Sequence, residues 1–142
     1  MKSKTIIALR GVANQGKTTS IKIAYELLKD AYPKAHIEEF YIGVDITVII
    51  TVNGVKIGIE SQGDPNSRLF QSLRHFVGIG CKVIICATRS RGATVEAVNA
   101  FAGKYQIKWY PKSGASSTSK QVADNRSFAQ QIVAAVRAAV DA

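Results

Sequence analysis

The chain has 142 residues, of which 46% are hydrophobic and 20% are charged, as in ordinary globular domains. This composition excludes a disordered or collagen-like chain, and no apolar run reaches the roughly 20 residues that a membrane-spanning helix needs. The formal net charge of +9 is unusual, and a basic surface attracts polyanions such as nucleotides and nucleic acids. We expect one domain over residues 1–142, located in the cytoplasm, with no membrane partner.

The chain begins with the pattern of a buried strand followed by a helix. Residues 5–9 form a short, continuously apolar run, which is typical of a strand covered on both faces. Apolar residues at helical spacing then predict a helix from about residue 17 to residue 29, which Pro33 stops. Residues 31–43 are polar and irregular in pattern, so no regular element is expected there.

A β-hairpin is predicted next. The β-rich runs 44–52 and 55–59 flank the dipeptide Asn53-Gly54. Both residues of this dipeptide accept a positive φ, so it is the strongest short-range signal for a hairpin turn. The two runs are therefore expected to pair as antiparallel strands.

A helix and another buried strand follow. Asp64-Pro65 fits a helix N-cap with proline at the first helical position, and Gly78 and Gly80 end the predicted helix. Its apolar residues are Leu69, Phe70, Leu73, Phe76 and Val77. Residues 82–87 form the next buried strand of the prediction.

The last third of the chain repeats this alternation. After the polar loop 88–92, Val95, Val98 and Phe101 predict a helix, and residues 106–110 predict the last strand. Residues 113–119 are rich in serine and glycine, which indicates a loop. A final helix is predicted to end near Asp141, with an apolar face formed by Val122, Ala129, Ile132, Val133, Val136 and Val140.

Alternating strands and helices predict an α/β fold. We expect three layers: a mostly parallel sheet of about five strands, with one antiparallel hairpin strand and helices on both faces.

The segment between the first strand and the first helix matches the pattern GxxxxGK[ST]. The predicted phosphate-binding residues are Gly11, Val12, Ala13, Asn14, Gln15, Gly16, Lys17, Thr18 and Thr19. Glycines let the backbone turn so that its N–H groups point at phosphate oxygens, and the helix N-terminus adds partial positive charge. Lys17 is expected to reach the β- and γ-phosphates and to serve catalysis, and the Thr18 hydroxyl is expected to bind Mg²⁺.

On this motif and its order of elements, the chain resembles the P-loop NTPase superfamily. The resemblance implies a phosphate loop after the first strand of a three-layer fold, with a nucleoside triphosphate and Mg²⁺ as ligands. The hairpin followed by Glu60-Ser61-Gln62-Gly63 is similar to the arrangement in small and translational GTPases. There the second hairpin strand ends in Asp-x-x-Gly, whereas this chain has glutamate at that position.

A triphosphate site usually needs a carboxylate at the tip of the strand beside the phosphate loop. Glu60 is the first candidate for this metal-binding and catalytic role. Asp64 is the alternative, with helix capping as its competing role. Gln62 lies where a residue positions a water or senses the γ-phosphate, although a loop glutamine bonded to backbone explains it equally well.

Arg89 and Arg91 directly follow the strand 82–87. Ligands of α/β sheets lie outside the carboxyl ends of the strands, so these guanidinium groups are candidates to neutralise charge on a transferred phosphoryl group. Two solvated loop arginines are the alternative interpretation. The guanine-specifying pattern Asn-Lys-x-Asp is absent after residue 80, which favours ATP. The base pocket is expected in the loop 109–119.

Three functions remain open at this point. The first is Mg²⁺-dependent binding and hydrolysis of a nucleoside triphosphate, most simply ATP. The second is a small-molecule or nucleotide kinase, for which a chain of 142 residues leaves little room for an acceptor domain and a lid. The third is a non-enzymatic nucleotide-dependent binding module that contacts nucleic acid. The Lys and Arg residues are scattered along the sequence, so no motif supports nucleic acid as a partner.

Overall fold

The computed structural model describes residues 4–11, 16–111 and 118–141, with side chains in the last range from residue 121 onward. The strands are β1 (Thr5–Arg10), β2 (His36–Ile42), β3 (Ile46–Val52), β4 (Val55–Glu60), β5 (Val83–Thr88) and β6 (Gln106–Pro111). The helices are α1 (Lys17–Ala31), α2 (Leu69–Gly78), α3 (Ala93–Asn99) and α4 (Thr118–Val140).

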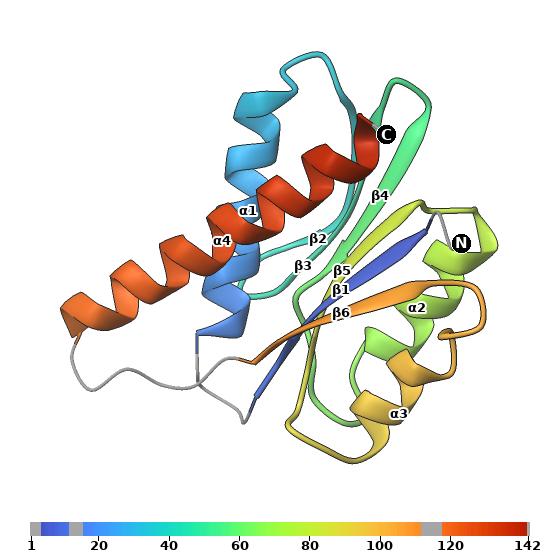
Figure 1. The fold of residues 1–142 in the computed structure, drawn as a ribbon, viewed down its shortest axis with the longest axis vertical. Helices are drawn as coiled ribbons and strands as arrows, with labels where there is room; N and C mark the ends of the chain where they lie inside the picture. The colour runs from blue at the N-terminus through green and yellow to red at the C-terminus, as the bar shows by residue number, and fades with distance from the viewer. Residues whose placement is uncertain (1–3, 12–15, 112–117, 142) are drawn as a thin grey trace.

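The strands form one mixed α/β sheet in the order β2-β3-β4-β5-β1-β6 (Figure 1). The pairs β4–β5, β5–β1 and β1–β6 are parallel, whereas β3 is antiparallel to both β2 and β4. The sheet therefore has six strands and two antiparallel pairs, rather than about five strands and a single hairpin strand. It also places β5 between β1 and β4, so the strand that carries Glu60 is not the neighbour of β1.

The additional strand is β2, in the segment 31–43 that was expected to be irregular, so that prediction was wrong. All its residues except Ile37 are exposed, and its register with β3 shifts between Glu39 and Tyr41. β2 lies at the edge of the sheet, where it is held by backbone hydrogen bonds to β3 and buries little side chain. Its sequence therefore does not show the apolar alternation by which strands are usually predicted.

The predicted hairpin is confirmed. Val52 pairs with Val55, and the two turn residues have positive φ angles of 50° at Asn53 and 80° at Gly54. These signs are those of a tight hairpin turn whose twist matches the twist of the strands.

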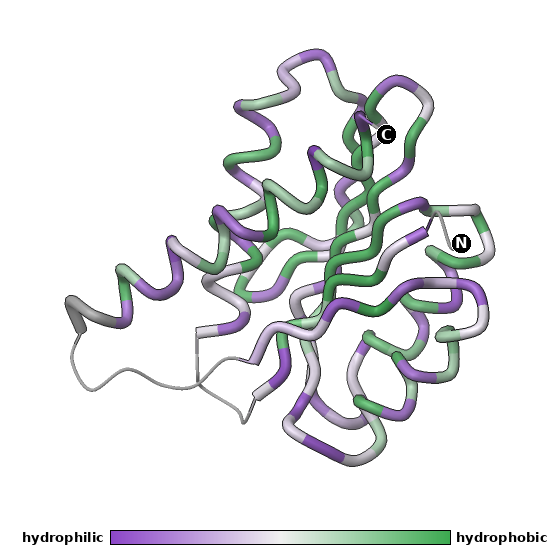
Figure 2. Tube along the Cα trace, in the orientation of Figure 1, coloured by the Kyte–Doolittle hydropathy of each residue, from purple (hydrophilic) through white to green (hydrophobic). Residues whose placement is uncertain are grey.

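Helices cover both faces of the sheet, as predicted (Figure 1). Alternate residues of each central strand point to opposite faces. Ile7, Leu9 and Ile85 pack against α1 and α4, whereas Ile6 and Ile84 pack against α2 and α3. The central strands are accordingly apolar along most of their length (Figure 2).

Three helix predictions need correction. α2 begins at Leu69, so Asp64 is not its N-cap, because residues 64–68 form turns instead. α3 ends at Asn99, and Phe101 packs against the core from the turn that follows. The first turns of α4 extend past the sheet (Figure 1), and Val122 there is 62% exposed.

The remaining residues predicted for the apolar face of α4 are buried or half-buried against the core. Within residues 4–11, 16–111 and 118–141, none of the helices combines the length and the apolar character needed to cross a bilayer.

Candidate functional site

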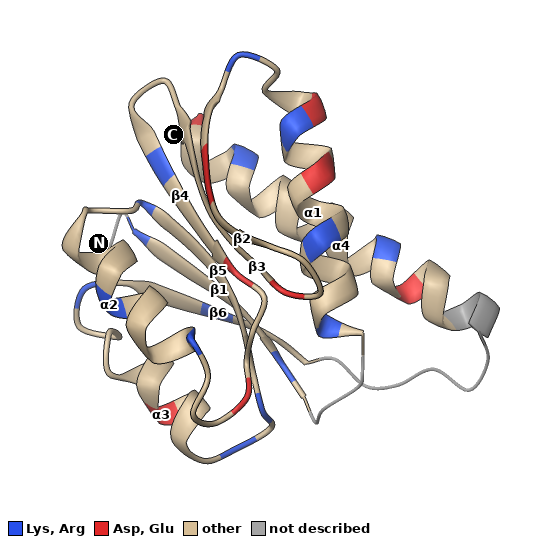
Figure 3. Cartoon of the chain, turned by 180° about the vertical axis from the view of Figure 1, so that it is seen from behind, with Lys and Arg blue, Asp and Glu red and all other residues tan. Residues whose placement is uncertain are grey.

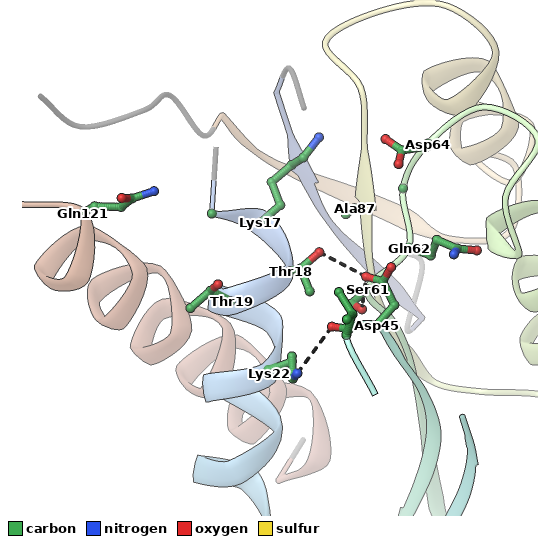
Figure 4. Close-up of a pocket in the computed structure, with 13 residues that line it drawn as sticks. Lys17, Thr18, Thr19, Lys22, Asp45, Ser61, Gln62, Asp64, Ala87 and Gln121 are labelled. Carbon is green, nitrogen blue, oxygen red and sulfur yellow. Dashed lines mark hydrogen bonds between the residues drawn. The ribbon is translucent and has the colours of Figure 1, made fainter. Parts of the chain in front are cut away.

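A pocket of about 640 Å³ lies at the carboxyl ends of the parallel strands (Figure 4). Its lining comes from the start of α1, the segment before β3 and the loop after β4, with further contributions from β5 and α4. The lining residues are Gly16, Lys17, Thr18, Thr19, Lys22, Val44, Asp45, Ser61, Gln62, Gly63, Asp64, Ala87 and Gln121. The fold thus brings both predicted and unpredicted residues to one place.

The start of α1 presents backbone donors to this pocket. Gly16 is the N-cap and has a left-handed conformation, with φ 81° and ψ 13°. Helix geometry leaves the first amides, those of Lys17, Thr18 and Thr19, without an intrahelical acceptor. Such amides, together with the helix dipole, attract anions. The predicted phosphate-binding residues Val12, Ala13, Asn14 and Gln15 lie outside the described residues.

Lys17 is a buried cation whose hydrogen-bond acceptors are neutral. Its side chain is 7% exposed, and Nζ donates to the carbonyl oxygens of Gly11 and Thr88 at 2.5 Å each. Burial lowers the pKa of Lys17 to about 8, Asp64 opposes this shift, and Arg89 adds to it. Among the described residues, no carboxylate forms a salt bridge with this ammonium group.

Beside Lys17, three oxygen-bearing side chains meet. The Thr18 hydroxyl donates to Asp45 Oδ1 at 3.1 Å, and the Ser61 hydroxyl donates to the same oxygen at 2.8 Å. The Ser61 oxygen in turn accepts from the backbone N–H of Ile46 at 2.9 Å. Figure 4 shows Thr18, Ser61 and Asp45 close together at one side of the pocket.

Asp45 was missed by the sequence analysis, although the predicted hairpin contains a signal for it. In an antiparallel pair, the start of the first strand lies beside the end of the second. Asp45 immediately precedes β3, so it had to lie next to the residues that follow Glu60. Lys22 steadies this segment by donating to the carbonyl oxygens of Gly43 (2.7 Å) and Val44 (3.3 Å).

Glu60 lies elsewhere. It is 0% exposed, and its Oε1 accepts hydrogen bonds from the hydroxyls of Thr47 and Ser72, both at 2.6 Å. Its Oε2 accepts from the backbone N–H of Gln62 at 3.0 Å, and Arg68 Nε lies 3.6 Å from Oε1.

Consecutive strand residues point to opposite faces, so Glu60 points toward α2 while Ile59 packs on the α1 face. The structure therefore does not bring Glu60 to Thr18, and Glu60 does not line the pocket. Its metal-binding role stays a prediction from the sequence.

Gln62 and Asp64 do reach the pocket, on the side opposite α1. The side-chain Oε1 of Gln62 accepts from the backbone N–H of Arg68 at 2.8 Å, the loop role weighed in the sequence analysis. Asp64 Oδ1 accepts from Arg89 Nε at 2.8 Å, and both side chains are partly exposed. Neither Arg89 nor Arg91 is part of the pocket lining. Arg91 is exposed, whereas Arg89 adjoins the pocket through its contact with Asp64.

The predicted base pocket is only partly described, because residues 112–117 lie outside the described residues. Within the described part, the guanidinium group of Arg10 lies 5.2 Å from the ring centroid of Trp109. Gln121 of α4 also lines the pocket described above, on the side of α1 to which Thr19 points (Figure 4).

Comparison of the chain with protein-family models gives no match. Searches of curated proteins and of solved structures give no significant match either. What this pocket does must therefore follow from its geometry.

Proposed function

We propose that the pocket binds the phosphates of a nucleoside triphosphate, ATP in the first instance, together with Mg²⁺, and that the protein hydrolyses this ligand. The observation that carries the proposal is Lys17 at the N-terminus of α1, a buried ammonium group whose acceptors among the described residues are two carbonyl oxygens. A buried charge is costly unless an opposite charge compensates it. A polyphosphate in the adjoining pocket would supply that charge.

The phosphate-binding part of the proposal uses the first turn of α1. The amides of Lys17, Thr18 and Thr19 donate hydrogen bonds to phosphate oxygens, and Lys17 exchanges its carbonyl acceptors for the β- and γ-phosphates. The pocket of about 640 Å³ falls within the size range of small-molecule sites.

The residues beside Thr18 fit a magnesium ion. Mg²⁺ prefers oxygen ligands and is usually held by one or two carboxylates together with substrate phosphates. The side-chain ligand atoms available here are all oxygens, from Thr18, Asp45 and Ser61. Of these three residues, Asp45 supplies the carboxylate. We therefore assign Asp45, rather than Glu60, as the carboxylate on the metal side, with Thr18 as its partner. When bound there, Mg²⁺ would neutralise negative charge on the polyphosphate.

The opposite side of the pocket supplies groups for the hydrolytic step. A water molecule attacks the γ-phosphorus and the bond from this phosphorus to the β–γ bridging oxygen breaks. The products are the nucleoside diphosphate and inorganic phosphate, and one proton of the water passes to solvent. The partly exposed Asp64 carboxylate accepts a hydrogen bond from this water and orients it. Arg89, which Asp64 holds at 2.8 Å, neutralises charge on the phosphoryl group.

The test is calorimetric titration and phosphate release with Mg·ATP, using wild type, Lys17→Ala and the control Lys34→Ala, which changes an exposed lysine. We expect wild type and the control to bind ATP and release phosphate, and Lys17→Ala to do neither.

The same experiment separates the alternatives. Absence of magnesium-dependent heat with ATP, GTP, CTP and UTP would overturn the proposal. Turnover only with an added acceptor identifies a kinase, and binding without turnover identifies a non-enzymatic module.

A further inference from the structure

A row of lysines lies at the amino ends of the parallel strands, on the edge of the sheet opposite the pocket. Lys82 is the middle residue of this row. Its backbone N–H donates to the carbonyl oxygen of Lys56 at 2.9 Å, and its carbonyl accepts from the N–H of Thr5, the residue after Lys4. Lys56, Lys82 and Lys4 therefore stand at one level on three neighbouring strands, which are spaced about 4.8 Å apart.

These side chains also share a face of the sheet. Lys4 lies two residues before Ile6, which faces α2 and α3, and its ammonium group lies 5.7 Å from the ring centroid of Tyr105 in that layer. Lys56 Nζ lies 3.5 Å from the carbonyl oxygen of Ile79, which follows α2. Figure 3 shows basic segments at the starts of β4, β5 and β1.

The row carries positive charge without carboxylate partners. The salt bridges in the described part of the chain involve Lys29, Arg68 and Arg89, and none involves Lys4, Lys56, Lys82 or the exposed Lys104. Like charges on adjacent strands destabilise a sheet. The negative end of the α2 dipole explains the position of Lys56, whose ammonium group lies by the Ile79 carbonyl oxygen. Within the described residues, no such hydrogen bond is seen for Lys4 or Lys82.

We propose that this edge, formed by Lys4, Lys56 and Lys82, binds the phosphate backbone of duplex nucleic acid without sequence preference. A duplex presents about one negative charge per 1.7 Å of its axis, which a row of closely spaced ammonium groups neutralises. Lysine is a point charge suited to phosphate, whereas base readout favours the forked donors of arginine.

A duplex fits this edge better than a single strand does. Proteins that bind single strands combine basic grooves with exposed aromatic rings on which bases stack. Tyr105, the ring beneath Lys4, is only 1% exposed, so it offers no stacking surface. The large exposed apolar side chains of the described residues lie on β2, before β3 and on α4.

The test compares two triple variants of equal charge by fluorescence anisotropy with a labelled duplex of mixed sequence. The first is Lys4→Gln, Lys56→Gln, Lys82→Gln, and the control is Lys34→Gln, Arg126→Gln, Arg137→Gln, at exposed positions elsewhere. Each lost phosphate contact lowers the slope of log K against log[salt] by about 0.9. In the first variant we expect the magnitude of this slope to fall by about 2.7 and the affinity at about 50 mM salt to fall at least about tenfold. The control should have a slope and an affinity near those of wild type.

Other outcomes would overturn the proposal. These are equal losses in both variants, absence of wild-type duplex binding at about 50 mM salt, tighter binding to single strands, or binding only to vesicles of anionic lipid. Duplex DNA and duplex RNA are both measured, and binding to either supports the proposal.

If circular dichroism shows the first triple variant to be unfolded, the single variants Lys56→Gln and Lys82→Gln replace it. Each is then expected to lower the slope by about 0.9, and an unchanged slope in both contradicts the proposal. The triple variant and the two single variants should bind ATP as tightly as wild type, because the lysine row lies at the edge of the sheet opposite the pocket. The result is thus independent of the proposed nucleotide chemistry.

Discussion

At the scale of single residues, the protonation of Lys17 governs the proposed chemistry. An ordinary lysine has a pKa of 10.5, but burial lowers the pKa of Lys17 to about 8. The group is therefore charged at neutral pH, when it is needed to bind phosphate, yet it is close to losing its proton.

The first prediction concerns pH. Above about pH 8 the folded protein loses the Lys17 proton, whereas the unfolded chain keeps it up to its ordinary pKa of 10.5. Since the unfolded state then binds more protons, the contribution of Lys17 to the free energy of unfolding rises between these two values. Affinity for Mg·ATP should instead fall by about tenfold per pH unit once the pH exceeds this pKa. Calorimetry between pH 7 and pH 9.5 measures the fall, and an affinity that does not change across this range contradicts the prediction.

The second prediction separates the two carboxylates. Asp45→Asn should raise the Mg²⁺ concentration needed for half-maximal ATP binding and turnover by about tenfold or more, since it removes the carboxylate that the described structure places beside Thr18. Glu60→Gln should instead lower the free energy of unfolding by about 2 kcal/mol, because the buried carboxylate accepts three hydrogen bonds. Magnesium titrations and urea unfolding of both variants measure the two effects. A larger rise of this Mg²⁺ concentration in Glu60→Gln would restore the assignment made from the sequence.

At the scale of elements, close approaches determine how helices dock on the sheet. A Cβ atom built on Gly16 would lie 2.4 Å from Asn125 Oδ1, so α4 packs directly on the start of α1. A Cβ atom on Gly58 would lie 2.5 Å from Phe76 Cγ, so α2 lies against the backbone of β4. Packing against the Phe76 ring therefore requires glycine at position 58. At position 16 glycine is required by its positive φ of 81°, because the end of the Asn125 side chain can turn aside.

The third prediction tests the contact between β4 and α2. Gly58→Ala should lower the free energy of unfolding by about 1–3 kcal/mol, because the added methyl group overlaps the Phe76 ring. In Phe76→Leu the smaller side chain should relieve part of that cost, which a double-mutant cycle in urea detects. Gly78→Ala is the matched control, since a Cβ atom there meets open space. Equal effects of the two alanine substitutions would refute the packing argument.

At the scale of the whole molecule, an apolar layer packs on each of the two faces of one sheet. Ile84 and Ile85 are neighbours in β5, yet Ile84 packs in the layer with α2 and α3 and Ile85 in the layer with α1 and α4. Because the same strands form the floor of both layers, neither layer is expected to unfold alone.

The fourth prediction follows from this shared sheet and also tests the expectation of one domain. Ile84→Ala and Ile85→Ala should each lower the free energy of unfolding by about 2–5 kcal/mol. In each variant, far-ultraviolet circular dichroism and the fluorescence of Trp109 should report the same transition midpoint in urea. Two separate midpoints in either variant would show that the layers unfold independently.

Most element types were predictable because they depend on local patterns. Apolar runs identified β1 and β5, helical periodicity identified α1, and the Asn53-Gly54 turn identified the hairpin. β2 could not be identified in this way, since an edge strand is held by pairing with its neighbour and buries few side chains. The start of α2 was also misjudged, because Asp64 is paired with Arg89 from a distant strand end rather than with a helix amide.

The sequence by itself determined that a loop with the pattern GxxxxGK[ST] joins a buried strand to an amphipathic helix, because that pattern lies within eight consecutive residues. Only the tertiary structure decided that β5 separates β1 from β4, that Asp45 rather than Glu60 lies beside Thr18, and that lysines far apart in the chain form a row. These features depend on strand order and register, which arise from pairing between distant segments. The local Asn53-Gly54 turn encodes the pairing of β3 with β4, but no local pattern encodes the pairing of β4 with β5 or of β5 with β1.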